Sequence, residues 1–477
     1  MAAVTEPPRR GISLGLGVGL CVVAAGVAIG LRPLSDNSFF THLSTGRLIL
    51  DRGAVPSHDP YTFTAQGEPW VVQSWLASVL YATAERLGGA LGLRLVSGAI
   101  SGALTAILWR LARPADGVLG RVLIVGLAVG VGGELWGERP FMLGLVALAL
   151  LVLAAEDGLD PRWLVPVGWI WVNAHGSFPL GLAYLVVAAV GRRLDGGSVA
   201  IERRCFGWAG LGMLLGAIGP VGPKLLVFPV ELLQKQELLR HVIEWQAPTF
   251  ESLSQRVFLV ELVIAIVVLA RRPSYRTGLL IGVFAAAALV GSRNVTVASI
   301  VLVPGLAAGM PMLGTLRSDA RTLFAKGLAG VGLAVFALVA VVRLDEPPYS
   351  FGGYPVDAVA FLDASEVDLR THRLAAQDYV GNYLELVYGP GERVFYDDRF
   401  DMFPDAASDA HFSLVQAQSD VRSQLDRYDI ELVVWERTSA VAPRLVVDPD
   451  WRVLFADDAW VLVCRRGASL GGRLDTC

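Results

Sequence analysis

The stretch "GISLGLGVGLCVVAAGVAIGL", residues 11–31, contains no charged side chain and is long enough to cross a bilayer as a helix. Two Arg precede it and no A-x-A-like cleavage site ends it, so we expect a retained first span with a cytoplasmic N-terminus. The rest of the 477-residue chain has the same character, since 54% of its residues are hydrophobic and 18% are charged. A soluble domain has about a quarter charged residues. The composition therefore predicts a polytopic membrane protein.

Apolar runs of about 17–22 residues recur as far as Val342, and their length matches the bilayer core. They predict a mostly α, polytopic helical bundle with about eleven spans. The spans are expected near residues 11–31, 91–111, 118–136, 140–155, 163–175, 177–191, 205–221, 256–270, 277–292, 295–312 and 325–342.

The C-terminal part of the chain differs in charge. Residues 343–477 contain 24 Asp and Glu, 13 Arg and no Lys. Short apolar runs such as "IELVVWE" and "WVLVCRR" are typical of strands, and helical patterns occur around 355–365 and 411–427. We therefore expect a transmembrane domain over residues 1–342 and a small soluble α+β domain over residues 343–477.

Basic clusters indicate the orientation, because cytoplasmic loops are enriched in Arg and Lys. With the spans above, "WRLARP", "GRRLDGG", "ARRPSYR" and "LRSDARTLFAK" all fall on the cytoplasmic side. This agreement requires the amphipathic segment 70–89 to lie at the outer interface instead of spanning. We expect a first outer loop of interfacial helices over about residues 36–88, and a C-terminal domain outside the cytoplasm.

The Cys residues form no disulfide framework and no metal-binding motif. Cys21 and Cys205 lie in apolar runs, whereas Cys464 and Cys477 lie near the C-terminus. A bridge between the last two is left open. The sequence also contains no Walker loop, no GxGxxG, no Ser-His-Asp arrangement and no basic nucleic-acid patch, so we expect no nucleic-acid partner.

Polar residues gather at the expected outer ends of the spans. Ionisable groups at that depth are costly unless they line a polar cavity. Chemistry, if present, is therefore expected on the outer face. These residues include Asp36, His42, His58, Asp59, Glu134, Glu138, Arg139, Asn173, His175, Glu244 and Arg293.

Several motifs carry a family resemblance. They are "SDNSFFTHLSTGRLILDRGAVPSHDPYTF" at 35–63, "WVNAHGSFPLG" at 171–181, "IEWQAP" at 243–248, "SRNV" at 292–295 and "YVGNYLELVY" with "VFYDDRFDMFP" at 379–404. In this order they resemble bacterial polytopic proteins similar to the GT-C glycosyltransferases, which include protein O-mannosyltransferases, lipid A aminoarabinose transferases and oligosaccharyltransferase catalytic subunits. The resemblance implies a multi-pass enzyme of the bacterial cytoplasmic membrane. Such an enzyme moves a sugar from a polyprenyl-phosphate-linked donor to an extracytoplasmic glycan, lipid or protein, by an inverting displacement with an Asp general base.

The resemblance places the first-loop acid at Asp36. A carboxylate there could deprotonate an acceptor hydroxyl while Phe39 and Phe40 face lipid. The alternative is that Asp36 only caps the following helix. Many relatives carry a second Asp two residues later, whereas this chain has Asn37-Ser38.

A second acid must then come from elsewhere if the chemistry needs one. Asp59 is a candidate, although Asp-Pro also favours a structural Asx-turn. Glu134 is the other catalytic candidate, and Glu138 would share its helical face at i,i+4 spacing if the span continued. We expect the acids of the two outer loops to converge on one outward-facing cavity.

The remaining candidates are expected to bind substrate. Arg139 and Arg293 could hold the lipid phosphate bidentately, or only snorkel to the interface. Asn173 and His175 could bind sugar hydroxyls or close a helix end. His42, His58, Glu244 and Trp245 complete the predicted set, with residues 231–245 expected as an interfacial helix. The cluster Asp397, Asp398, Arg399 and Asp401 could bind a cation or a glycan, but is more typical of a solvated loop.

No obligatory cofactor is expected, and a divalent cation such as Mg²⁺ or Mn²⁺ is left open. Two other functions compete with the glycosyltransferase. A lipid or glycan transporter would need polar residues in the middle of several spans. A catalytically silent scaffold for envelope assembly would account for the acid that is missing at Asn37-Ser38.

Overall fold

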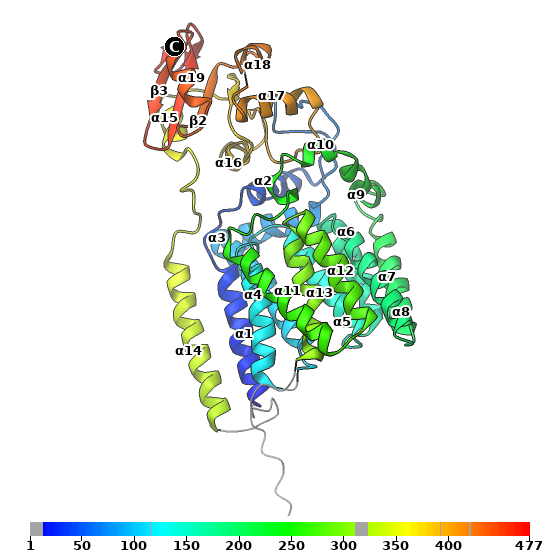
Figure 1. Cartoon of the computed structure of the whole chain (residues 1–477). Coiled ribbons are helices and arrows are strands. Elements are labelled where there is room, and N and C mark those ends of the chain that lie inside the picture. The colour runs from blue at the N-terminus through cyan, green and yellow to red at the C-terminus, as the bar shows by residue number, and fades with distance from the viewer. Residues whose placement is uncertain (1–12, 116, 311–322, 392, 419–420) are drawn as a thin grey trace, which may run out of the picture. The chain divides into compact units, whose positions relative to one another are not determined.

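The computed structural model describes residues 13–477 except 116, 311–322, 392 and 419–420. The chain forms two compact units (Figure 1). Unit 1 contains residues 1–34, 84–229 and 239–348, and unit 2 contains residues 35–83, 230–238 and 349–477. Residues 35–83, expected as part of the transmembrane domain, thus fold together with the C-terminal residues.

Unit 1 is built from helices. They are α1 (Leu14–Gly30), the second part of α3 (Trp75–Leu111), α4 (Val118–Gly132), α5 (Phe141–Ala155), α6 (Leu164–Ala174), α7 (Pro179–Leu194), α8 (Ala200–Leu215), the first part of α9 (Lys224–Gln234), α11 (Leu253–Arg271), α12 (Tyr275–Val290), α13 (Asn294–Gly309) and α14 (Leu323–Asp345), with short 3-10 turns η1 (Pro161–Trp163) and η2 (Ile243–Trp245).

Each expected span coincides with one of these helices, but the number of crossings stays a prediction. Among the described residues, three helices are long and apolar enough to cross a membrane: Trp75–Leu111, Leu253–Arg271 and Lys326–Asp345. Five of the other coinciding helices are apolar but shorter, and they lie at Leu14–Gly30, Val118–Gly132, Phe141–Ala155, Tyr275–Val290 and Asn294–Gly309.

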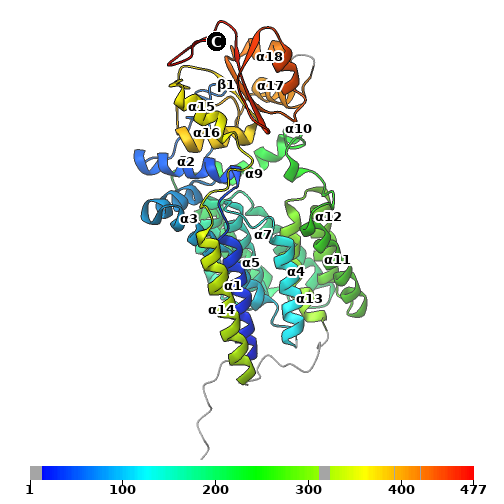
Figure 2. The same ribbon diagram turned by 90° about the vertical axis from the view of Figure 1, so that its left-hand side faces the viewer.

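The helices of unit 1 pack in pairs (Figures 1 and 2). α1 lies along α14, α6 along α8, and α12 against both α7 and α13. The α6–α8 pair approaches closely through Gly212, where a Cβ would lie 2.3 Å from the Val165 carbonyl oxygen. Small residues at such crossings are typical of helix pairs that pack in lipid.

α3 is two helices joined at Gly89, whose φ of 58° and ψ of −149° interrupt the helical backbone. After this break the chain doubles back, because a Cβ on Gly92 would lie 2.2 Å from the Ala84 carbonyl oxygen. The amphipathic segment 70–89 therefore ends where the apolar helix begins, which is the separation that the sequence predicts.

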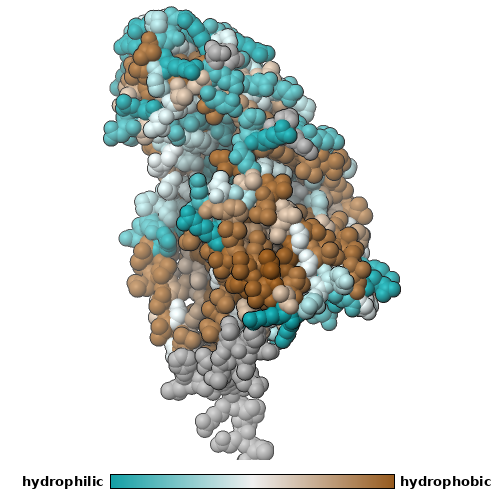
Figure 3. Space-filling model, in the orientation of Figure 1, coloured by the Kyte–Doolittle hydropathy of each residue, from teal (hydrophilic) through white to brown (hydrophobic). Residues whose placement is uncertain are grey.

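Apolar side chains cover much of the visible face of unit 1 (Figure 3). On α11, Val260, Val263 and Ile266 are more than half exposed. Exposed apolar area of this extent is expected of a surface that contacts lipid or another protein.

Unit 2 combines helices with a small sheet. Its helices are α2 (Asn37–Arg52), the first residues of α3, the end of α9, most of α10 (Gln236–Leu239), α15 (Val356–Ala364), α16 (Asp378–Tyr388), α17 (Asp405–Val415), α18 (Val421–Arg427) and α19 (Ala442–Val447). The four-stranded sheet has the order β1-β2-β4-β3, and its strands are β1 (Leu374–Ala375), β2 (Leu432–Glu436), β4 (Trp460–Arg465) and β3 (Trp451–Ala456). β1 is parallel to β2, whereas the other neighbours are antiparallel. A mostly helical chain with a small C-terminal sheet agrees with the predicted fold class.

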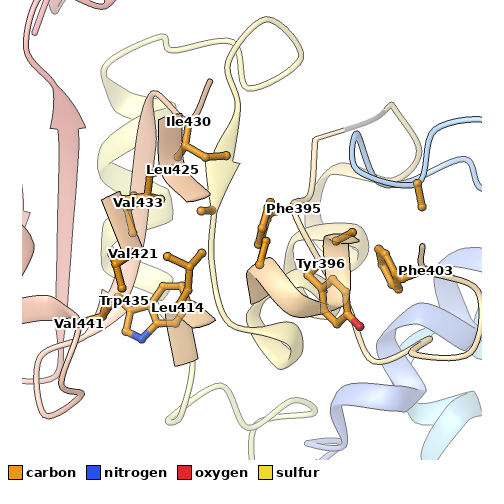
Figure 4. Close-up of a cluster of buried hydrophobic side chains, with 14 of the residues drawn as sticks. Phe395, Tyr396, Phe403, Leu414, Val421, Leu425, Ile430, Val433, Trp435 and Val441 are labelled. Atoms are coloured by element: carbon orange, nitrogen blue, oxygen red, sulfur yellow. The ribbon is translucent and has the colours of Figure 1, made fainter. Parts of the chain in front are cut away.

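The core of unit 2 lies on β2 and the helices beside it (Figure 4). Leu414, Leu425, Val433 and Trp435 are buried there, and Phe395, Tyr396 and Phe403 extend the same cluster. Leu48, Tyr61, Trp70 and Val72 of the N-terminal segment belong to it as well. The N-terminal segment is therefore part of the core of this unit.

Phe39 and Phe40 do not face lipid, and that expectation is wrong. Both side chains are completely buried. The Phe39 ring packs edge-on against Tyr81, with centroids 5.2 Å apart, and the Phe40 ring lies 5.7 Å from Phe351. The apolar face of α2 is covered by protein of the same unit.

A disulfide joins Cys464 on β4 to Cys477. It closes the end of the chain, including β5 (Ser469–Gly471) and β6 (Asp475–Thr476), onto the sheet. The bridge that the sequence left open is thus present, and Cys21 and Cys205 are free thiols.

Candidate functional site

Asp36 is the N-cap of α2. Its Oδ1 accepts a hydrogen bond of 3.2 Å from the backbone N of Phe39. The helix ends at Arg52, where Gly53 adopts a left-handed φ of 67°. The capping role that the sequence left open is therefore present, and the Asp36 residue is half-buried.

Asn37, which lies between Asp36 and the position of the missing acid, faces another carboxyl group. The Nδ2 atom of Asn37 lies 3.5 Å from Oδ2 of Asp398. Asn382 on α16 ties these two segments together, because it donates to the Asn37 carbonyl at 3.1 Å and accepts from the Asp398 backbone N at 3.0 Å. Burial, Asp397 and, more weakly, Asp36 raise the pKa of Asp398 to about 7.

Asp59 lies in a buried ionic cluster. Its carboxylate accepts bonds from the backbone N atoms of Tyr61 at 3.2 Å and Thr62 at 2.8 Å, and from the Thr62 hydroxyl at 2.5 Å. Arg399 Nη2 contacts its Oδ1 at 2.8 Å. The Asx-turn alternative is therefore realised, and the same carboxylate also pairs with Arg399.

Arg399 is the centre of this cluster. Its Nε and Nη2 donate to the two oxygens of Asp397 at 3.0 and 2.5 Å, and Nη2 lies 3.5 Å from Glu385. The guanidinium also lies over the rings of Trp70, at 4.4 Å, and Tyr61, at 5.0 Å. Nearby carboxylates raise the pKa of Arg399 above its usual range, although burial opposes this.

Glu385 brings α2 and α16 together. The Thr41 hydroxyl donates to its Oε2 at 2.5 Å, and the Ser44 hydroxyl donates to its carbonyl at 2.7 Å. The side chain is fully buried beside Asp397 and Arg399. Burial and the charge of Asp397 raise the pKa of Glu385. Asp59, Asp397 and Glu385 thus place three carboxyl groups around one guanidinium.

The two His of the first loop have different hydrogen-bond partners. His42 Nδ1 shares a 3.1 Å hydrogen bond with the Ser78 hydroxyl, inside unit 2. His58 is exposed, and its Nδ1 lies 3.0 Å from Ser57 Oγ. Of the pair, only His42 lines a cavity with Asp398 and Arg399.

Unit 1 contains the predicted cationic residues, and it brings four candidates together. Arg139 forms an ion pair with Glu244. Arg293 lies over the ring of Trp245 at 4.8 Å and over that of Phe141 at 5.4 Å. Its backbone N donates to the Glu244 carbonyl at 3.1 Å.

Arg139 and Arg293 are close enough to influence each other. Burial, and then the charge of Arg139, lower the pKa of Arg293 to about 10. A cluster of two guanidinium groups and one carboxylate keeps a net positive charge, which is the property that an anion site needs. The segment before it is not one interfacial helix, because α9 ends at Gln234, α10 ends at Leu239 and η2 follows at Ile243–Trp245.

Asn173 and His175 stabilise the end of α6. Asn173 is fully buried, and its Nδ2 donates to the carbonyls of Trp169 at 2.9 Å and Gly216 at 3.2 Å. His175 Nδ1 accepts from the Ser177 backbone N at 3.1 Å, and its ring lies 5.2 Å from Phe141. Through Phe141, His175 belongs to the surroundings of Arg293.

Glu134 and Glu138 do not share a helical face, because α4 ends at Gly132. Arg32 holds the turn that follows, donating to the carbonyls of Gly133 and Trp136 at 2.9 Å each. Glu134 is exposed, whereas Glu138 is buried. Burial lowers the pKa of Arg32, and the negative charge of Glu138 partly opposes this. The expected i,i+4 pair is therefore absent. Glu134 belongs to unit 1 and Asp36 and Asp59 to unit 2, so their convergence stays a prediction.

Sequence reasoning missed Glu385 and undervalued the Asp397–Asp401 stretch. The interpretation of that stretch as a solvated loop is wrong for Asp397 and Arg399, which are buried. The available signal was the aromatic setting "VFYDDRFDMF", since Phe is often buried, and Asp and Arg next to each other can be buried as a pair. In the described part of the chain, no group of three or more His, Cys, Asp or Glu has an arrangement that could hold a metal ion.

Comparison with known proteins identifies the fold. No protein-family model and no curated protein sequence matches the chain. Among solved structures, the oligosaccharyltransferase of Archaeoglobus fulgidus, tethered with an acceptor peptide containing the NVT sequon, matches with a TM-score of 0.53 and 12% identity, over 88% of this chain and 69% of that one.

Two further structures match over 96% of this chain at 14% identity and a TM-score of 0.50. One is ArnT from Cupriavidus metallidurans bound to undecaprenyl phosphate, of which 98% is covered. The other is the arabinofuranosyltransferase AftD from Mycobacteria, of which the chain covers 40%. These neighbours are glycosyltransferases of the GT-C class, and the chain has a fold similar to theirs.

Proposed function

We propose that the chain is a membrane glycosyltransferase that moves a sugar from a polyprenyl-phosphate-linked donor to an extracytoplasmic acceptor. The observation that carries this proposal is the similarity to ArnT, which extends over nearly the whole of both chains. That neighbour binds undecaprenyl phosphate, and the oligosaccharyltransferase neighbour holds an acceptor peptide. A fold alone does not fix a reaction, so the residues must supply the rest.

The cluster Arg139, Arg293 and Glu244 is the proposed site for the lipid phosphate. Arg binds phosphate through parallel N–H donors, and the stacking of Arg293 on Trp245 orients its guanidinium. A phosphate would compete with Glu244 for Arg139 and leave the cluster close to neutral. Without ligand, Arg139 pairs with Glu244, and the cluster keeps one net positive charge that attracts the phosphate.

Asp36 is the proposed general base. It takes the proton of an acceptor hydroxyl while the acceptor oxygen bonds to the anomeric carbon. The bond from that carbon to the phosphate oxygen breaks, and its electron pair leaves with polyprenyl phosphate. One displacement of this kind inverts the anomeric configuration, and the phosphate leaving group needs no strong general acid.

The other two acids receive different proposed roles. Asp59 already accepts bonds from Tyr61, Thr62 and Arg399, so we assign it to positioning Arg399 instead of proton transfer. Glu134 is exposed and remains the candidate for orienting the acceptor. No step requires a divalent cation.

The proposed location of unit 2 is outside the cytoplasm. The Cys464–Cys477 disulfide supports this, since disulfides persist in oxidising compartments and are rare in the cytosol. The asymmetric distribution of Arg and Lys in the loops gives the same orientation.

The decisive experiment incubates the purified full chain with a panel of polyprenyl-phosphate sugars and compares wild type with Asp36→Asn. Asn is as good an N-cap as Asp, so α2 should keep its start. Loss of a general base should reduce turnover about 100-fold or more. Asp51→Asn, an exposed change near the other end of α2, is the matched control. No donor consumption by wild type, or full activity of Asp36→Asn, would favour the silent scaffold.

A further inference from the structure

Unit 2 contains a cavity that the proposed roles leave unused. It has a volume of about 90 Å³ and is lined by Ser38, Thr41 and His42 of α2, by residues 70–74, and by Asp398, Arg399 and Asp401. A cavity needs a volume of about 10–15 Å³, measured in the same way, to hold one water molecule. The cavity is thus large enough for several water molecules or for part of a polar ligand.

Two buried polar atoms of the lining residues lack partners among the described residues. Ser74 is 1% exposed and its Oγ makes no hydrogen bond, and Arg399 is 8% exposed and its Nη1 makes none. Buried polar groups are almost always hydrogen-bonded, because an unmet donor costs about 1–3 kcal/mol. Both atoms are therefore expected to bond a ligand or water in the cavity.

The charges of the lining argue against an anion. Arg399 is already paired with Asp59 at 2.8 Å and with Asp397 at 2.5 Å. Asp398 and Asp401 add two carboxyl groups to the wall. A phosphate or carboxylate would meet these acids without an unpaired cation, whereas a neutral group that both donates and accepts would satisfy the whole lining.

The protonation of the two acids fits such a group. Burial raises the pKa of Asp398 to about 7 and that of Asp401 to about 6. Near neutral pH each carboxyl can therefore accept a hydrogen bond or donate one. Trp70, Val71 and Val72 supply the apolar part of the wall.

We propose that this cavity binds a neutral sugar residue of the acceptor. Its hydroxyl groups accept from Arg399 Nη1, exchange hydrogen bonds with Ser74 Oγ, and meet the carboxyl groups of Asp398 and Asp401, while its C–H faces lie on the apolar wall. The identification of this sugar as the acceptor rests on the proposed function, but its binding does not. Asp398 then lies between the sugar and Asn37, next to the helix that Asp36 caps.

The test measures binding in the absence of donor. The full chain in detergent is titrated with methyl hexopyranosides, methyl pentofuranosides, methyl N-acetylhexosaminides and sugar 1-phosphates, using saturation-transfer NMR. We expect at least one neutral glycoside to bind more tightly than its 1-phosphate. Ser74→Ala and Asp398→Ala should each raise its Kd about 10-fold or more, since each removes a side-chain hydrogen bond to the buried sugar. Asp458→Asn, on the exposed surface, should not.

The outcomes separate the two proposals. Binding of no glycoside, a preference for sugar phosphates, or equal binding by wild type and both cavity variants would overturn the cavity assignment. Thermal melts of each variant check that it folds, and Ser74→Ala removes one atom only. Donor consumption without glycoside binding would leave the proposed function standing and remove this inference, whereas glycoside binding without donor consumption would do the reverse.

Discussion

Replacing Arg399 with Met should destabilise unit 2 strongly. The change removes a guanidinium that contacts Asp397 at 2.5 Å, Asp59 at 2.8 Å and Glu385 at 3.5 Å, and it leaves those buried carboxyl groups without a cation. Removal of one partner from a buried ion pair costs about 3–5 kcal/mol. For a folding unit of this size, such a loss lowers Tm by roughly 6–20 °C.

The assay is thermal unfolding of the purified full chain, followed by tryptophan fluorescence. Arg422→Met is the matched control, because Arg422 pairs with Asp450 on the exposed surface. An exposed pair contributes about 0–1 kcal/mol, so this control should melt within a few degrees of wild type. The cost of Arg399→Met should also shrink as the pH falls, since burial raises the pKa of both Asp59 and Glu385 and protonation removes their charge.

Two results would refute this reasoning. One is a shift for Arg399→Met no larger than that for Arg422→Met, which would mean that the cluster is solvated or dispensable. The other is a cost that stays constant from pH 5 to pH 8, which would mean that unpaired carboxylate charge is not the cause.

Three further predictions concern separate sites. The pKa of Asp398 is raised from 3.8 to about 7, so the stability that its neutral form contributes is present below about pH 4 and is lost as the pH rises through 7. Thermal melts should therefore show a smaller decrease in Tm between pH 5 and pH 8 for Asp398→Asn than for wild type. Equal decreases would contradict this pKa. Arg293→Lys keeps the positive charge but loses the planar guanidinium with its paired donors, so KM for the polyprenyl-phosphate donor should rise about 10-fold in steady-state kinetics, with kcat little changed. An unaltered KM would count against a phosphate-binding role for Arg293. Cys477→Ser opens a bridge across 13 residues and should cost about 2–3 kcal/mol; dithiothreitol should lower the melting temperature of wild type to that of the variant and leave the variant unchanged, and a wild type that does not respond would show that the bridge is absent.

The helices were predictable because they depend on local properties. Long apolar runs specify a helix by length alone, and the eleven expected spans coincide with helices. The separation between the amphipathic and apolar parts of α3 was also visible, since Gly88-Gly89 lies between them. These sequence patterns do not reveal whether lipid or protein covers an apolar helix face. Phe39 and Phe40 would have the same periodicity against lipid as against Tyr81 and Phe351.

The candidate site shows the same limit. Asp36 and Asp59 could be found because each follows a recognisable signal, an N-cap position and an Asp-Pro turn. The ionic partner of Asp59 could not, because Arg399 lies more than 300 residues away in the chain. The i,i+4 argument for Glu134 and Glu138 failed for a comparable reason, since a distant Arg32 binds the carbonyls that follow α4.

The assembly of unit 2 from separated segments has a consequence for biosynthesis. About 265 residues are translated between Thr83 and Tyr349, the residues at which its first and last segments meet the intervening chain. At about 5–20 residues per second, the ribosome needs roughly 10–50 seconds for them. During that time α2 has emerged, while Phe351 and Glu385 do not yet exist to cover its face. The nascent chain must hold this aromatic helix at the membrane surface or on a chaperone until the last segment arrives.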